Sequence, residues 1–265
     1  MIPKAQIKEI RLLHLKKHRE RYGCFVAEGD KTVCSFLESP WYVVERIYAL
    51  PVWVEARSAI LQLHPDVPVE MINPDQLSQI SRLHTPQQVL ALIRLPVPPA
   101  LPARLQELVL ALDAIRDPGN LGTIIRIADW FGIRYICCSP DCADAFQPKV
   151  VQASMGSLAH VHIVEETLTT LFQQHPDIPV LAATLNGKPI QQFQWNRDQT
   201  RAAFLLIGNE AHGISPALLQ MATTCITIPR LGQAESLNAA IATGILCAFL
   251  CLTETAKPAP DKSAE

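Results

Sequence analysis

The chain contains no Cys-x-x-Cys pair, although it has 8 cysteines in 265 residues. Cys138 and Cys142 are four residues apart, as are Cys247 and Cys251, but neither pair has a second pair of ligands near it in the sequence. This spacing argues against the common structural zinc sites, so we expect no metal. Most of the cysteines are expected to be small buried apolar residues of a reduced protein.

The sequence also lacks a long apolar run. Its longest, Ile241–Leu252, is too short to span a bilayer and contains Thr243 and Gly244. The first ten residues, MIPKAQIKEI, have no apolar core of the kind found in signal peptides. We therefore expect a cytoplasmic protein that has no membrane partner.

A large excess of charge of one sign is absent as well, since the formal net charge is −2. This argues against a protein that binds polyanions over its whole surface. The charge is uneven, however, because residues 4–21 hold seven Lys and Arg but two Glu, which leaves about +5 there and about −7 elsewhere. A basic segment on a near-neutral protein fits local contact with a phosphate backbone. A solvated helix face is the other interpretation.

The clearest boundary in the chain is Leu95–Pro102, which has four prolines in eight residues. Such a segment continues neither a helix nor a central strand, and it is typical of a semi-rigid linker. We predict a first domain at residues 1–95, a linker at 96–104, a second domain at 105–256 and a disordered tail at 257–265.

Helical and strand patterns alternate on both sides of this linker. Before it, we predict a helix over about the first 22 residues, strands at Cys24–Ala27, Val43–Tyr48, Val69–Ile72 and Val89–Leu95, and helices at Lys31–Leu37, Ala56–Leu63 and Pro74–Ile80. After it, we predict strands at Leu108–Asp113, Tyr135–Cys138, His160–Val164, Val180–Thr184, Phe204–Ile207 and Thr224–Ile228, with helices between them. The sequence thus predicts two α/β domains, of which the first is the smaller.

Three segments share one design, namely Leu108–Ala128, Ala203–Ser215 and Cys225–Leu246. Each begins with a short apolar run, breaks into Gly, Asn, Pro or Ser, and resumes at helical spacing. Strand, loop and helix in this order form the half-unit of a parallel sheet. Ligands of such sheets bind beyond the carboxyl ends of the strands, where these loops lie. The three loops therefore predict one composite site.

The polar residues of these loops carry a family resemblance. The first loop has Asp117-Pro118-Gly119-Asn120-Leu121-Gly122 with Arg126, the second has Gly208-Asn209-Glu210 with Gly213 and Ser215, and the third has Ile228-Pro229, Gly232 and Glu235-Ser236-Leu237-Asn238. In order and spacing they resemble the three motifs of the SpoU (TrmH-like) branch of the SPOUT RNA methyltransferases. Ala211 and Ala234 depart from the usual family residues, but neither removes a polar group.

The resemblance implies a fold, a reaction and partners. It implies an α/β protein whose second domain is a SPOUT trefoil knot, with a parallel sheet flanked by helices. It implies a ribosomal-protein-like first domain that binds substrate RNA. The implied protein is a homodimer that uses S-adenosylmethionine to methylate a ribose 2′-hydroxyl of tRNA or rRNA. Methyl transfer of this kind is a direct displacement, so the enzyme must align the two reactants and handle one proton.

The resemblance also assigns residues. The expected catalytic residues are Asn120, Arg126, Glu210, Ser236 and Asn238. The expected donor-binding residues are Thr184, Leu185, Gly208, Asn209, Glu210, Gly213, Ile228, Leu231, Gly232, Ser236 and Leu237. The expected RNA-binding residues are Lys8, Arg11, Lys16, Lys17, Arg19 and Arg126.

Elementary chemistry refines some of these roles. A guanidinium stays protonated in proteins, so Arg126 is better suited to hold a phosphate and stabilise a developing alkoxide than to act as a base. Glu210 is expected to orient Arg126 or Asn120. We expect Asn120 to start its helix, and Asp117 to shape the turn. Ser236 and Asn238 can also act as helix caps.

Three alternatives compete with this interpretation. A Rossmann oxidoreductase is disfavoured because neither Gly119–Gly122 nor Gly208–Gly213 has the G-x-G-x-x-G spacing. A non-catalytic RNA-binding relative is disfavoured because all the expected catalytic residues are present. Methylation of a base by the same fold stays open on the residues alone.

Overall fold

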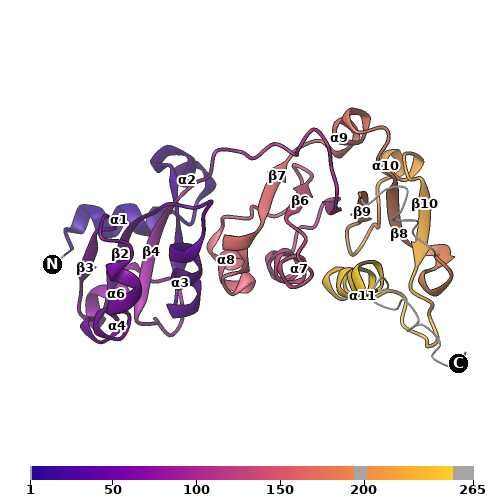
Figure 1. Ribbon diagram of the computed structural model, residues 1–265. Coiled ribbons are helices and arrows are strands. Elements are labelled where there is room, and N and C mark those ends of the chain that lie inside the picture. The colour runs from indigo at the N-terminus through magenta and orange to yellow at the C-terminus, as the bar shows by residue number, and fades with distance from the viewer. Residues whose placement is uncertain (1, 194–201, 253–265) are drawn as a thin grey trace, which may run out of the picture.

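Two β-sheets, one in each half of the chain, organise the protein (Figure 1). The computed structural model describes residues 2–193 and 202–252, so the tail expected at 257–265 lies outside the described residues. The first sheet has four strands in the order β1-β4-β2-β3, and the second has six in the order β10-β8-β9-β5-β6-β7. The predicted α/β class is confirmed for both halves.

The first sheet mixes antiparallel and parallel pairing. Its strands are β1 (Cys24–Glu28), β2 (Val44–Ala49), β3 (Val69–Met71) and β4 (Val89–Arg94). Strand β4 runs antiparallel to β1 and β2, while β3 runs parallel to β2. The helices are α1 (Lys4–Leu12), α2 (Lys16–Tyr22), α3 (Asp30–Glu38), α4 (Pro51–Ala56), α5 (Ser58–Gln62) and α6 (Pro74–Ile80). Apolar residues of α1 and α6 pack on one face of the sheet, and those of α3 and α4 on the other.

Two of the expected helices are divided. The single helix expected up to residue 22 ends at Leu12 and resumes at Lys16, because the Leu13 carbonyl accepts a hydrogen bond from the Arg19 guanidinium at 2.7 Å. The helix expected at Ala56–Leu63 is two short helices, the first of which starts at Pro51. Proline fits the first position of a helix, where its missing N–H leaves no bond unmade.

The second sheet is parallel throughout. Its strands are β5 (Leu108–Leu112), β6 (Tyr135–Cys138), β7 (His162–Glu165), β8 (Val180–Pro189), β9 (Ala203–Ile207) and β10 (Thr224–Thr227). Strand β8 runs past the predicted end at Thr184, and after a register shift it pairs Lys188 with Ile226 of β10. The other strands lie within a few residues of their predicted positions.

Helices cover both faces of the second sheet. They are α7 (Pro118–Trp130), α8 (Pro148–Ser154), η1 (Ser157–His160), α9 (Leu168–Gln174), η2 (Ile190–Gln192), α10 (Pro216–Gln220) and α11 (Ala239–Leu252). Leu110 of β5 packs into the core that includes α7, α8 and α11, whereas its neighbours Val109 and Ala111 pack with α9 and α10. This alternation is what a strand buried on both faces requires.

The two halves share one apolar core. Figure 1 shows α3, α8, α7 and α11 as successive neighbours, and β1 of the first half lies against α8 of the second. Phe25 of β1 packs against Phe146, with ring centroids 5.1 Å apart. The domain limits at residues 96–104 and the knotted path of the second half stay predictions. Within the described residues, no helix combines the length and apolar character that a bilayer-spanning segment requires.

Candidate active site

The three loops that carry the motifs meet at one edge of the parallel sheet. Strand β9 lies between β5 and β8, and β10 lies on the far side of β8. Because all these strands run parallel, their carboxyl ends share one edge. The loops that follow β5, β9 and β10 are therefore neighbours, as the composite-site prediction requires.

The first turn of α7 is built by the loop after β5. Asp117 is the residue that caps this helix, and its carboxylate accepts a hydrogen bond from the Asn120 backbone N–H at 2.8 Å. Pro118 occupies the first helical position. The prediction that Asn120 starts the helix is wrong, because the helix begins two residues earlier. The shift frees the Asn120 side chain for contacts outside the helix, while Asp117 shapes the turn as expected.

A chain of side-chain hydrogen bonds joins the three motifs. The Asn120 amide donates to the Glu210 carboxylate, with 2.5 Å between Nδ2 and Oε1. The Asn238 amide in turn donates to Asn120 Oδ1 at 2.8 Å. Asn120 is thus held from both sides, by the second motif and by the third. Glu210 was expected to orient Arg126 or Asn120. In the structure it contacts Asn120 and not Arg126.

Asn238 has a second task at the start of α11. Its Oδ1 accepts hydrogen bonds from the backbone N–H groups of Ala240 at 2.9 Å and Ile241 at 3.3 Å. This is the capping role that the sequence allowed, and it fixes the amide plane so that Nδ2 points at Asn120. Ser236 is exposed and forms no hydrogen bond within the part of the chain that the structure describes.

Arg126 lies two turns into α7 and is exposed. Its guanidinium forms no hydrogen bond or ion pair with the residues that the structure describes. Exposed Trp130 lies one turn further along the helix, on the same side. The side chain is therefore available to a partner outside this chain, which suits a role toward an anionic acceptor.

The loop after β9 folds so closely on itself that only glycine fits at position 208. A Cβ at this position would lie 2.3 Å from the Gly213 carbonyl carbon and 2.4 Å from the Ile214 nitrogen. Gly213 itself has φ +68, a conformation that side chains disfavour. Asn209 completes the loop, because its amide donates to the Ala114 carbonyl at 2.8 Å. Asn209 therefore ties the second motif to the first.

Several of the expected donor-binding residues lie in the middle of β8 and in the loop after β10. Thr227 Oγ1 donates to the Leu185 carbonyl at 3.1 Å, which ties the end of β10 to the middle of β8. Leu185, Leu231 and Leu237 are exposed apolar side chains. The hydroxyl of Thr184 is buried and has no hydrogen-bond partner among residues 2–193 and 202–252. A buried polar atom of this kind can be satisfied by a polar group of a ligand, and exposed apolar side chains can be covered by its apolar part.

Sequence reasoning missed the residues that support this edge from behind. Asp113 accepts a hydrogen bond from the Ser215 N–H at 2.7 Å, and Ser139 Oγ accepts one from the Ala114 N–H at 2.9 Å. Cys142 Sγ accepts another from the Ile115 N–H at 3.3 Å. The neighbouring Cys138 thiol and nearby hydrogen bonds lower the pKa of Cys142 below the usual thiol value, although burial opposes this shift. The role of Asp113 could have been predicted, because it directly follows the apolar run of β5 and so lies at the carboxyl edge of the sheet.

The basic amino-terminal segment divides into exposed and buried residues. Lys8, Arg11, Lys16 and Lys17 are exposed, as RNA contact would require. Arg19 is only 3% exposed, and its guanidinium contacts Asp144 Oδ2 at 2.6 Å. The expectation that Arg19 binds RNA is therefore corrected, because a buried and paired guanidinium cannot reach a phosphate.

Within residues 2–193 and 202–252, no group of three or more His, Cys, Asp or Glu side chains is placed to hold a metal ion. Cys138, the last residue of β6, is buried, and Cys142 in the loop after it is half-buried.

Known proteins resemble the chain over nearly its whole length. The model of the SpoU rRNA Methylase family matches residues 107–248, and that of the MRM3-like substrate binding domain matches residues 4–91. The 23S rRNA (guanosine(2553)-2′-O)-methyltransferase RlmP of Bacillus subtilis is 34% identical over 91% of this chain and 94% of its own. The 23S rRNA (uridine(2479)-2′-O)-methyltransferase of Streptomyces viridochromogenes is 30% identical over 89% and 85%.

A solved structure shares the arrangement of both halves. The AdoMet-bound rRNA methyltransferase of Sinorhizobium meliloti superposes with a TM-score of 0.82, at 30% identity, over 94% of this chain and 96% of that one. The likeness includes the first half of the chain as well as the motif-bearing second half.

Proposed function

Because the chain belongs to the SpoU rRNA methylase family, we propose that it methylates a ribose 2′-hydroxyl of rRNA with S-adenosylmethionine as the donor. The observation that carries the proposal is the bonded series Asn238–Asn120–Glu210, which assembles all three motifs at one sheet edge. Two relatives similar over most of the chain support rRNA and the 2′-hydroxyl as the target.

The residues on β8 and in the loops after β9 and β10 fit the donor. Leu185, Leu231 and Leu237 offer apolar contact for an adenosine, and the Thr184 hydroxyl, without a partner in the described residues, offers a hydrogen bond. Gly208 lets the loop after β9 fold closely on itself, which fixes the backbone of the second motif. The donor supplies an activated methyl group with its own leaving group. The task of the chain is therefore to align donor and acceptor.

Arg126 serves the acceptor RNA in this proposal. Its free, exposed guanidinium binds the phosphate next to the target ribose and stabilises the oxygen as the 2′-hydroxyl loses its proton. Asn120 and Glu210 hold the first turn of α7, so that Arg126 projects from a helix whose start is fixed.

We further propose that the protein works as a homodimer. Helix α11 (AAIATGILCAFLCL) has no charged residue, yet Ile241 and Leu252 on it are exposed. Trp130 on the adjoining α7 is also exposed. A helix that is apolar all round is normally buried, and a second copy of this surface is the occupant we propose. Arg126 lies one helical turn from Trp130, so it would act at the junction of the two copies.

The exposed basic residues of α1 and α2 are proposed to contact RNA outside the target nucleotide. Lys8, Arg11, Lys16 and Lys17 lie in the half of the chain that matches a substrate-binding domain. Their contacts would be to phosphates and therefore sensitive to salt.

A methylation assay with labelled donor tests the proposal. Unmodified 23S rRNA is incubated with the protein, and bulk tRNA serves as the comparison substrate. The product RNA is then hydrolysed in alkali, which needs a free 2′-hydroxyl at each cleaved position. Label recovered in an alkali-resistant dinucleotide supports ribose methylation of rRNA. Label in mononucleotides would point to base methylation, and label only in tRNA would overturn the proposed substrate.

A further inference from the structure

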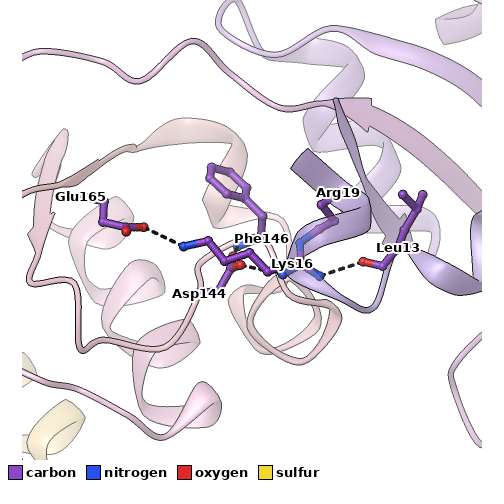
Figure 2. A network of polar contacts seen from close by, with 6 residues as sticks. All are labelled: Leu13, Lys16, Arg19, Asp144, Phe146 and Glu165. Carbon is purple, nitrogen blue, oxygen red and sulfur yellow. Dashed lines mark hydrogen bonds and ion pairs between the residues drawn. The ribbon is translucent and has the colours of Figure 1, made fainter. Parts of the chain in front are cut away.

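A buried ion pair fastens the amino-terminal half of the chain to the catalytic half. Figure 2 shows Arg19 of α2 reaching across to Asp144, in the loop between β6 and α8. The Nη2 of Arg19 contacts Asp144 Oδ2 at 2.6 Å, and its Nη1 donates to the Leu13 carbonyl at 2.7 Å. One guanidinium thus fixes both the bend between α1 and α2 and the contact with the second half.

Asp144 is equally constrained on its own side. Its Oδ1 accepts a hydrogen bond from the Phe146 N–H at 2.8 Å, so the carboxylate has a partner on each oxygen. The Phe146 ring packs on Phe25 of β1, next to this ion pair. The contact is therefore a pre-organised joint with apolar packing around it, and not a pair of mobile surface charges.

The loop that carries Asp144 is bonded directly to the catalytic loop. The residue before Asp144, Ala143, donates its N–H to the Ile115 carbonyl at 2.8 Å. Ser139 and Cys142 accept hydrogen bonds from the N–H groups of Ala114 and Ile115. Ile115 stands two residues before Asp117, the cap of α7. A short series of bonds therefore leads from α2 to the turn that holds Asn120.

We propose that Arg19 is a positioning residue, which through Asp144 holds the RNA-binding half at a fixed orientation relative to the loop of Asn120 and Arg126. When α1 and α2 bind the RNA, the target ribose then lies at a fixed distance from the catalytic residues. The expected effect on catalysis rests on the proposed function. The restraint of the loop at residues 139–146 is independent of that function.

A second ion pair across the same interface provides a contrast. Lys16 contacts Glu165 at 3.5 Å, and the two side chains are 54% and 58% exposed. Exposed pairs contribute little to rigidity, because solvent competes for both partners. Breaking a buried pair instead leaves a charge without a partner, which loosens the structure around it. The two pairs thus allow a matched comparison.

The test compares Asp144→Asn with Glu165→Gln in the full-length protein. Each change replaces a carboxylate with an amide, and only the first places an NH2 group beside either the Arg19 guanidinium or the Phe146 N–H. We expect Asp144→Asn to lower kcat on 23S rRNA by about tenfold or more, since small misplacements of reactants are costly. Its Kd values for donor and for RNA should stay within about twofold of the parent, as should kcat of Glu165→Gln.

Amide hydrogen exchange provides a readout that needs no substrate. Exchange at Ala143 and Asn120 should accelerate in Asp144→Asn and stay unchanged in Glu165→Gln. Arg19→Met, which keeps the apolar stem, should reproduce both effects if Asp144→Asn folds poorly. Equal kcat values for Asp144→Asn and Glu165→Gln, or a fall in kcat matched by weaker RNA binding, would overturn the positioning role. If the parent protein methylates no rRNA, the proposed function fails, and the exchange rates alone decide whether Arg19 restrains the loop.

Discussion

Asn120 and Glu210 are 90 positions apart in the chain, and a hydrogen bond of 2.5 Å joins their side chains. Asn120 also accepts a hydrogen bond from Asn238, so one amide group connects three loops that follow three different strands. Asn120 lies in the first turn of α7, whereas Glu210 and Asn238 lie outside helices and strands. The two bonds therefore couple the positions of the three motifs.

This dependence predicts non-additive effects of mutation. Asn120→Ala and Glu210→Ala should each lower kcat/KM by about tenfold or more, which is ~1.4 kcal/mol in activation free energy. The double variant should lose little beyond either single variant, because the shared bond is removed only once. Steady-state kinetics of the four proteins measures this coupling. Losses that simply add would show that the two residues act separately.

Arg126 is expected to act on the acceptor and not on the donor. Arg126→Ala should lower kcat by about 100-fold or more, in the range found when one stabilising donor to a developing oxyanion is removed. Donor binding should be unchanged, because the guanidinium forms no contact within the described residues. Arg126→Lys keeps the charge but loses the planar fork, so it should recover part of the rate. Calorimetric titration with the donor measures donor binding, and single-turnover kinetics measures the rate of methyl transfer. Full turnover by Arg126→Ala would refute the prediction.

Leu237 tests the location of the donor. A guanidinium in its place would meet the proposed adenosine site, so Leu237→Arg should weaken donor binding by about tenfold or more. Leu63→Arg introduces the same side chain at another exposed leucine, in the amino-terminal half, and should leave donor affinity unchanged. Calorimetric titration with S-adenosylmethionine and S-adenosylhomocysteine measures both variants. Equal affinities in the two would remove the donor from this loop.

Gly208 tests the close approach inside the second loop. The added methyl of Gly208→Ala would meet backbone atoms, which cannot move aside as a flexible side chain can. The variant should therefore lose about 1–3 kcal/mol of stability to urea and bind the donor more weakly. Gly244→Ala is the matched control, since its Cβ would lie 3.5 Å from Ile127 in ordinary contact. In a helix that change should stabilise by up to about 1 kcal/mol.

The apolar surface of α11 predicts the oligomeric state. Ile241→Glu should convert the proposed dimer into monomers, because a carboxylate would be buried against apolar side chains. Val52→Glu makes a comparable change at a residue of the same exposure, 55% against 56%, in α4 of the other half. Sedimentation velocity compares the two variants with the parent. A parent that sediments as a monomer at micromolar concentration would contradict the dimer.

Much of the catalytic half could be predicted from the sequence, because its strands are short apolar runs buried on both faces. A strand such as Leu108–Leu112 can be recognised locally, and the polar residues after it must then lie at the carboxyl edge of the sheet. This pattern locates the loops that hold Asn120, Glu210 and Asn238, and the family resemblance assigns these residues to the site. Their mutual bonds could not be predicted, since amide and carboxylate partners 90 and 118 positions apart leave no local pattern.

The joint between the halves could not be predicted for a different reason. A run such as Lys16–Arg21 is typical of a solvated face, and nothing in its spacing distinguishes Arg19 from its exposed neighbours. The burial of Arg19 depends on Asp144, which lies 125 positions away. A proline-rich segment likewise suggests two loosely connected parts, whereas the apolar core runs from one into the other.

The bond between Asn238 and Asn120 also has a consequence for synthesis. A ribosome makes the first partner 118 residues before the second, and α11 follows later still. A nascent chain that has released both sheets but not residue 238 holds its first two motifs without the third. The assembled site therefore forms only after residue 238 has left the ribosome and reached Asn120.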